Sequence, residues 1–256
     1  MGFTAFSTVA KSKVTAPMKA IRLEPGQQKS ASTIYLYLGA LFITSLVVSN
    51  LIFQKFFYWH PWEGSVFGVR LFELSVGILP YPITFLITDL ISEIYGKAKA
   101  NRVVFAGIFA SFFSMGILLV ANAVPAIEQS PIDDQIFQRV FSLSPLAVLA
   151  SMLAYLFAQF IDIRIYHFWK ALTQGKHLWL RNNFSTFASQ FIDTTTVVLL
   201  LCLFGILDWN LFWGLVLSGF IFKVLVAALD TPLLYLSVAI FRRKFSLEVG
   251  QEIQLD

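Results

Sequence analysis

The sequence predicts an all-α integral membrane protein with six transmembrane helices and both termini in the cytoplasm. Its residues are 57% hydrophobic and only 13% charged, whereas about a quarter of the residues in soluble domains are charged. The mean hydropathy is +0.72, and several windows of about 18 or more residues contain almost no charge. The uneven placement of the basic residues then predicts the orientation. An ordinary soluble domain is excluded.

Six apolar segments define the expected helices. They cover residues 33–57, 80–96, 101–124, 144–168, 183–207 and 210–240. The first and third segments are apolar almost throughout. The second follows Pro80 and ends near Gly96, a residue type that often comes directly after a helix. The fourth and fifth carry a few polar residues, and Pro232 predicts a kink in the sixth.

The connections predict one transmembrane domain between two tails. Residues 1–32 are expected to form a flexible basic cytoplasmic tail, 33–241 the six-helix domain and 242–256 a second tail. The aromatic segment 57–79 is expected to approach the second helix as an extended or re-entrant chain, not as a full span. The acidic segment "NAVPAIEQSPIDDQ" predicts a solvated loop.

The distribution of basic residues predicts the orientation. Most of the 19 Lys and Arg residues fall in the N-terminal tail, the second-to-third and fourth-to-fifth connections and the C-terminal tail. Because cytoplasmic loops are enriched in Lys and Arg, both termini are expected in the cytoplasm. The net charge of +4 therefore indicates orientation, and direct binding of nucleic acid is not expected.

Several kinds of chemistry find no support in the sequence. Cys202 is the single cysteine, and His60, His167 and His177 share no ligand spacing, so we expect no metal or other cofactor. No Walker A or serine-nucleophile motif is present, and we expect no enzyme activity. The "LDTP" around Asp230 suggests an intramembrane aspartyl protease as a weaker alternative, although the Gly-flanked Asp motif of such proteases is missing.

Polar side chains within the predicted spans indicate an internal site. A charge at mid-bilayer costs about 2.5–3.5 kcal/mol, so such groups usually face a cavity or a partner. Asp89 and Glu93 share one face of the second helix, and Lys223 is expected to pair with Asp89, Asp193 or Asp230. Acidic groups exceed basic ones at depth, which predicts a polar cavity that receives hydrogen-bond donors or a cation. Purely structural roles stay open for Asn50, Gln159 and Asp162.

Motifs on several predicted spans resemble one known family. The stretches "YPITFLITDLISEIYGKAKANRVV", "AQFIDIRIYHFW", "SQFIDTTTVV", "FKVLVAALDTPLLYL" and "VSNLIF" are similar to those of the queuosine precursor transporter family. The resemblance extends from about residue 33 to residue 241. It implies a six-helix inner-membrane importer, similar in fold to the substrate-binding subunits of energy-coupling-factor transporters.

The resemblance also implies a ligand and the residues that bind it. The ligand would be a 7-deazaguanine base for transfer-RNA modification: the 7-cyano form, the 7-aminomethyl form or queuine. The matching substrate-binding positions are Asn50, Asp89, Glu93, Gln159, Asp162, Gln190, Asp193, Lys223 and Asp230.

The roles expected of these residues follow from the groups on the base. Asp193 or Asp89 would accept hydrogen bonds from the guanine edge, and Lys223 would support the carbonyl or the carboxylates. Phe85, Tyr155 or Phe191 would stack on the ring. With no ATP motif in the sequence, import is facilitated, driven by ions such as protons, or dependent on a separate ATPase. A vitamin- or nucleobase-binding subunit that needs such an ATPase is the main alternative, and homo-oligomerisation stays open.

Overall fold

The computed structural model describes residues 20–53, 55–58, 65–66, 69–70, 73–141, 145–205 and 207–255. Long helices dominate these residues, which confirms the predicted all-α class. The helices are α2 (Pro25–Ile52), α3 (Tyr81–Ile94), α4 (Lys97–Ala123), α5 (Asp134–Phe141), α6 (Pro145–Leu172), α7 (Leu178–Leu203) and α8 (Phe212–Phe245), with short 3-10 turns η1 (Val76–Ile78) and η2 (Trp209–Leu211).

The strands are short and form three two-stranded pairs. β1 (Ala20–Ile21) runs parallel to β6 (Glu252–Ile253). β2 (Phe56–Tyr58) pairs antiparallel with β5 (Glu73–Ser75), and β3 (Ser65–Val66) pairs antiparallel with β4 (Val69–Arg70). β5 leads through the 3-10 turn η1 into α3, so the chain changes from an extended to a helical conformation shortly before this helix. Residues 59–64, 67–68 and 71–72 of the segment expected to be extended or re-entrant lie outside the described residues.

Five helical segments among the described residues have the length and apolar composition needed to cross a membrane. They are Pro25–Ile52, Val76–Ile94, Lys97–Ala123, Leu178–Leu203 and Trp209–Phe245. Large apolar side chains cover their outer faces; Phe109 is 74% exposed and Leu229 is 72% exposed. Exposed apolar surface of this extent is typical of contact with lipid. The predicted fourth span corresponds to α6, which is helical over 28 residues.

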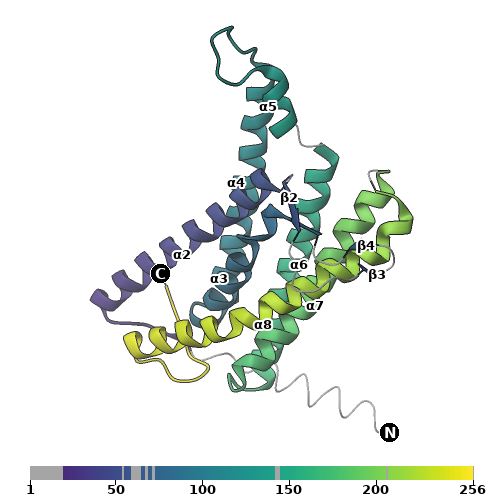
Figure 1. The fold of residues 1–256 in the computed structure, drawn as a ribbon. Coiled ribbons are helices and arrows are strands. Elements are labelled where there is room, and N and C mark those ends of the chain that lie inside the picture. The colour runs from purple at the N-terminus through teal and green to yellow at the C-terminus, as the bar shows by residue number, and fades with distance from the viewer. Residues whose placement is uncertain are drawn as a thin grey trace.

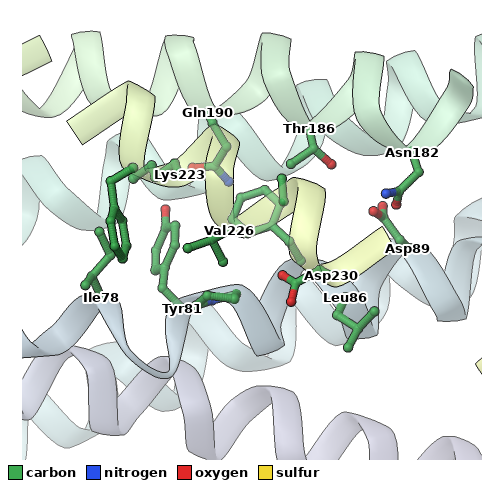
Figure 2. Close-up of a pocket in the computed structure, with 14 residues that line it drawn as sticks. Ile78, Tyr81, Leu86, Asp89, Asn182, Thr186, Gln190, Lys223, Val226 and Asp230 are labelled. Carbon is green, nitrogen blue, oxygen red and sulfur yellow. The ribbon is translucent and has the colours of Figure 1, made fainter. Parts of the chain in front are cut away.

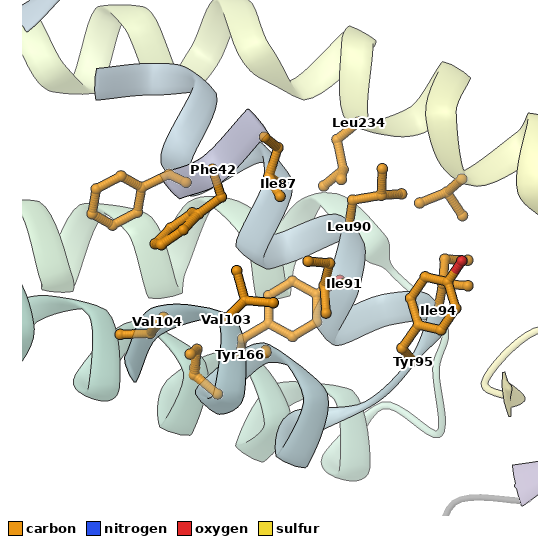
Figure 3. Close-up of a cluster of buried hydrophobic side chains, with 14 of the residues drawn as sticks. Phe42, Ile87, Leu90, Ile91, Ile94, Tyr95, Val103, Val104, Tyr166 and Leu234 are labelled. Atoms are coloured by element: carbon orange, nitrogen blue, oxygen red, sulfur yellow. The ribbon is translucent and has the colours of Figure 1, made fainter. Parts of the chain in front are cut away.

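Helix α3 lies at the centre of the bundle. It contacts α2 and α4 on one side and α6 and α8 on the other (Figure 1). Its buried residues Ile91 and Ile94 belong to one apolar cluster that also includes Phe42 from α2, Val104 from α4 and Tyr166 from α6 (Figure 3). Because α3 has apolar contacts on several sides, its polar residues are also held inside the molecule.

Several helix boundaries differ from the predicted ones. α2 begins at Pro25, inside the segment predicted as a tail, because proline is well tolerated in the first turn of a helix. α8 continues to Phe245 and is followed by β6, so part of the predicted C-terminal tail is also ordered against the helices. α5 forms at the end of the predicted acidic loop, where the Asp133 carboxylate accepts a hydrogen bond from the Ile136 N–H at 2.7 Å.

Gly96 makes the turn between α3 and α4 possible. Its φ of +82° lies in a region that residues with a side chain rarely adopt. The turn brings the start of α4 directly back from the end of α3, so the two helices are antiparallel neighbours. The predicted role of Gly96 at the end of the second span is confirmed.

The close approach of α2 and α4 depends on Gly107. A methyl group there would lie 2.5 Å from Phe42 Cε1 and 3.0 Å from Leu46 Cδ2, both buried. We expect Gly107→Ala to destabilise the protein by about 1–3 kcal/mol, measured by thermal unfolding in detergent. Gly116→Ala on the same helix is the matched control, because nothing lies within 4 Å of the added methyl group. Equal unfolding temperatures for the two variants would contradict this packing.

Candidate functional site

Among the described residues, two cavities that share lining side chains lie between the central helices. The Asp89 cavity is lined by α3, α7, α8 and Ile78 of η1, and its polar residues are Tyr81, Asp89, Asn182, Thr186, Gln190, Lys223 and Asp230. In Figure 2, Tyr81 and Lys223 lie at one end and Asp89 at the other. The Asn50 cavity continues toward the Leu203 end of α7, and its polar residues include Asn50, Tyr155 and Asp193.

The two cavities differ in free volume. Water-sized molecules can occupy about 230 Å³ of the Asn50 cavity but only about 30 Å³ of the Asp89 cavity. The smaller space holds no more than a few water molecules. The Asn50 cavity therefore offers far more free space to a small organic ligand than the Asp89 cavity does.

An ion pair lies where the two cavities meet. Lys223 Nζ is 2.5 Å from Asp193 Oδ2, and the Tyr81 hydroxyl donates to the same oxygen at 2.8 Å. The Lys223 ammonium also lies 5.0 Å from the centre of the Tyr81 ring. Tyr81 and Lys223 line both cavities. Of the three predicted partners for Lys223, the structure selects Asp193.

Two acceptor oxygens beside this ion pair receive no hydrogen bond from the described residues. Asp193 Oδ1 and Gln190 Oε1 are both buried and unpartnered. A buried acceptor without a donor costs about 1–3 kcal/mol, so a ligand that supplies N–H groups would gain from binding there. Asp230 also lines the Asp89 cavity, and Asn50 lines the other.

Gln159 and Asp162 are buried but line neither cavity. The Gln159 amide donates to the Tyr155 hydroxyl at 2.8 Å, so it supports an aromatic residue of the Asn50 cavity from behind. Asp162 accepts a hydrogen bond from the Ser189 hydroxyl at 2.9 Å and lies next to Asp89. The structure therefore places these two residues one layer behind the cavities.

Glu93 lies outside both cavities, in a cluster of buried ion pairs. Its carboxylate contacts Arg181 Nη2 at 2.6 Å, Arg242 Nη2 at 2.8 Å and Lys170 Nζ at 3.6 Å, and the Tyr166 hydroxyl donates to it at 3.0 Å. Its oxygens are fully occupied by the protein. Glu93 thus joins α3 to α6, α7 and α8, and its role in ligand binding stays a prediction.

The aromatic residues of the site only partly match the expectation. Phe85 lines the Asp89 cavity and Tyr155 lines the other, and both rings pack edge-on against each other. Phe191 instead is 43% exposed, packs against Phe220 and lines neither cavity. Sequence reasoning missed Tyr81, although it lies one turn before Phe85 on the same face as Asp89.

Helices with lipid-type outer faces, enclosing charged groups next to internal cavities, define a multi-pass membrane protein. Residues 75–237 match the family model described as "Putative vitamin uptake transporter". The "Probable queuosine precursor transporter" of Bacillus subtilis (strain 168) is 30% identical over 177 residues, which cover 65% of this chain and 73% of that protein. No solved structure matches the chain significantly.

The chain therefore belongs to this family of vitamin uptake transporters. The resemblance inferred from the sequence motifs is confirmed. The protein is a transporter and not an enzyme, so the alternative of an intramembrane protease is wrong.

The cluster around Glu93 generates a prediction about stability. Removing one partner of a buried ion pair leaves the other charges uncompensated, which costs about 3–5 kcal/mol. We expect Glu93→Gln to lower the thermal unfolding temperature in detergent markedly. Glu128→Gln, an exposed acid between α4 and α5, is the control and should change it little. A Glu93→Gln protein as stable as the control would exclude a structural role for the cluster.

Proposed function

We propose that the protein imports 7-deazaguanine precursors of queuosine across the inner (cytoplasmic) membrane for transfer-RNA modification. The observation that carries the proposal is the unpartnered Asp193 carboxylate oxygen beside Lys223, in a family member similar to a transporter named for these precursors. The candidate substrates are the 7-cyano and 7-aminomethyl bases and queuine.

The proposed topology has six spans and both termini in the cytoplasm. α6 supplies the sixth span, in addition to the five segments whose length and composition suit a membrane crossing. The positive-inside rule then places the Leu178 end of α7 at the cytoplasmic side. In this orientation the Asn50 cavity faces outward and the Asp89 cavity faces the cytoplasm.

The groups on the base complement those around the ion pair. A deazaguanine presents N1–H and an exocyclic amine as adjacent donors, and a carbonyl oxygen as an acceptor. Asp193 Oδ1 and Gln190 Oε1 would accept from the donors, while the Lys223 ammonium would donate to the carbonyl. Tyr81 and Tyr155 offer apolar ring faces for stacking. Charge-assisted hydrogen bonds would discriminate strongly against bases that lack these groups.

The proposed movement of the base rests on the difference in free volume between the cavities. The base would enter the larger Asn50 cavity and exchange its contacts with the Tyr81–Asp193–Lys223 layer. The Asp89 cavity would then widen to release it to the cytoplasm. The ion pair between Lys223 and Asp193 would thus separate the outward-facing cavity from the cytoplasmic one and would also form part of the recognition site.

The test is uptake in cells that cannot make queuosine precursors. Each base is fed, and queuosine is measured in transfer RNA. We expect the wild type to restore queuosine and Asp193→Asn or Lys223→Met to lower uptake about tenfold or more, because each loses a charge-assisted hydrogen bond of about 1.5–3 kcal/mol.

Asp208→Asn is the matched control, because this exposed acid lies just beyond the end of α7, the helix that carries Asp193. The amount of each variant in the membrane is measured in parallel. If no base restores queuosine in the wild type, the proposed substrate class is wrong. If both variants restore it as well as the control, Asp193 and Lys223 do not bind the base.

The Asp89 cavity also predicts a preference among the bases. Asp230 lines this cavity and has no hydrogen bond or ion pair among the described residues, so it can attract the cationic 7-aminomethyl group. We expect Asp230→Asn to reduce uptake of the 7-aminomethyl base several-fold more than uptake of the neutral 7-cyano base. Competition between the two bases measures this ratio, and an equal loss for both would refute the assignment.

A further inference from the structure

Two buried acidic side chains face each other between α3 and α6. Asp89 is 2% exposed and Asp162 is fully buried, and their carboxyl groups lie within hydrogen-bonding reach of each other. Asp89 Oδ1 and Asp162 Oδ2 receive no hydrogen bond from any N–H or O–H donor among the described residues. The Ser189 hydroxyl donates to the other oxygen of Asp162 at 2.9 Å.

We infer that Asp89 and Asp162 form a proton-binding site that couples import to the proton gradient. This inference rests on the proposed function and identifies the ion that drives it. Two carboxylates in direct contact and away from water cannot both stay charged, so they hold one proton between them. A proton is also the only cation small enough to fit between groups already at hydrogen-bonding distance.

The surrounding charges leave the pair without a counter-ion of its own. Arg181 on α7 attracts the Asp89 carboxylate electrostatically, but its guanidinium is already bound to Glu93, with Nη2 2.6 Å from Oε1. Asp230 on α8 adds a further negative group. The other groups near the pair, Tyr155, Tyr166 and Ser185, are uncharged or weakly acidic.

The basic residues at the start of α4, which also packs against α3, interact with other groups. Lys97 interacts electrostatically with His167 of α6, and Arg102 interacts electrostatically with Tyr35 of α2. Among the described residues, no group of three or more His, Cys, Asp or Glu side chains could hold a metal ion. These observations favour a proton over a larger cation at the pair.

Asp89 connects the proton site to the transport path. It belongs to the pair and also lines the Asp89 cavity, whereas Asp162 lies behind it. With the proton bound, the hydrogen bond holds α3 against α6. When the proton leaves, two like charges remain in contact and repel each other, which would widen the Asp89 cavity toward the cytoplasm. One proton would thus enter with each base and leave beside it.

Purified full-length protein in liposomes tests this inference with three readouts. They are exchange of labelled base at equal pH, accumulation of base driven by an inward proton gradient, and acidification of the lumen when base is added. We expect the wild type to show all three. Asp162→Asn keeps a hydrogen bond to Asp89 without needing a proton, so it should retain exchange but lose driven accumulation and acidification roughly tenfold or more.

The outcomes separate the two proposals. A wild type that exchanges no deazaguanine refutes the proposed function. A wild type that exchanges the base without acidifying the lumen, or that follows a sodium gradient instead, overturns only the proton site. Undiminished driven accumulation in Asp162→Asn also overturns it. Asp208→Asn is again the control.

Ser189→Ala provides a second variant in case Asp162→Asn does not fold. It keeps both carboxyl groups but removes the hydroxyl that stabilises the Asp162 carboxylate. We expect the pH at which driven uptake is half-maximal to shift to a higher value. An unchanged pH profile would overturn the proton site.

Discussion

The ion pair between Lys223 and Asp193 is the interaction on which the arrangement of the site depends. An ammonium group on a membrane helix is costly unless a carboxylate neutralises it, and Asp193 lies 2.5 Å away on the neighbouring helix. The pair fixes α8 against α7 at the level where the two cavities meet. Tyr81 adds α3 to the same contact. Any movement that joins the cavities must therefore break or exchange this contact, and in the proposed function the base, with both donors and an acceptor, would replace it.

The buried charges of this protein fall into two kinds. Glu93 is surrounded by Arg181, Arg242 and Lys170, so its carboxylate has no capacity for another partner. Asp193 and Asp89 each keep a buried oxygen without a donor. A carboxylate whose oxygens all have donors holds helices together. A buried carboxylate oxygen without a donor is unfavourable, and a ligand or a proton can remove that cost by binding to it. This difference in hydrogen bonding, more than depth in the membrane, distinguishes Glu93 from the acids that we propose bind the base or the proton.

Sequence patterns predicted the helices well because polar backbone groups are costly in lipid. Each membrane-crossing segment must therefore satisfy its own backbone hydrogen bonds, which a helix does whatever its neighbours are. Apolar windows and the asymmetry of basic residues required no knowledge of contacts between helices. The partners of the buried acids could not be predicted in the same way. Arg181 and Arg242, far from Glu93 in sequence, were interpreted as charges that set the orientation, and only the fold brings them to that carboxylate. The contact between Asp89 and Asp162 likewise depends on how α3 packs against α6.

The parallel pairing of β1 with β6 has a consequence for how the segment after α8 is held. It places Glu252 where its carboxylate accepts a hydrogen bond from the buried Lys170 ammonium at 2.9 Å. The Lys170 ammonium also donates to the Ser92 and Glu93 carbonyl oxygens at 3.0 and 2.8 Å, so it connects α6 to the end of α3 and to β6 at once. The segment that follows α8 is thereby anchored to the central helix by a buried charge as well as by strand pairing.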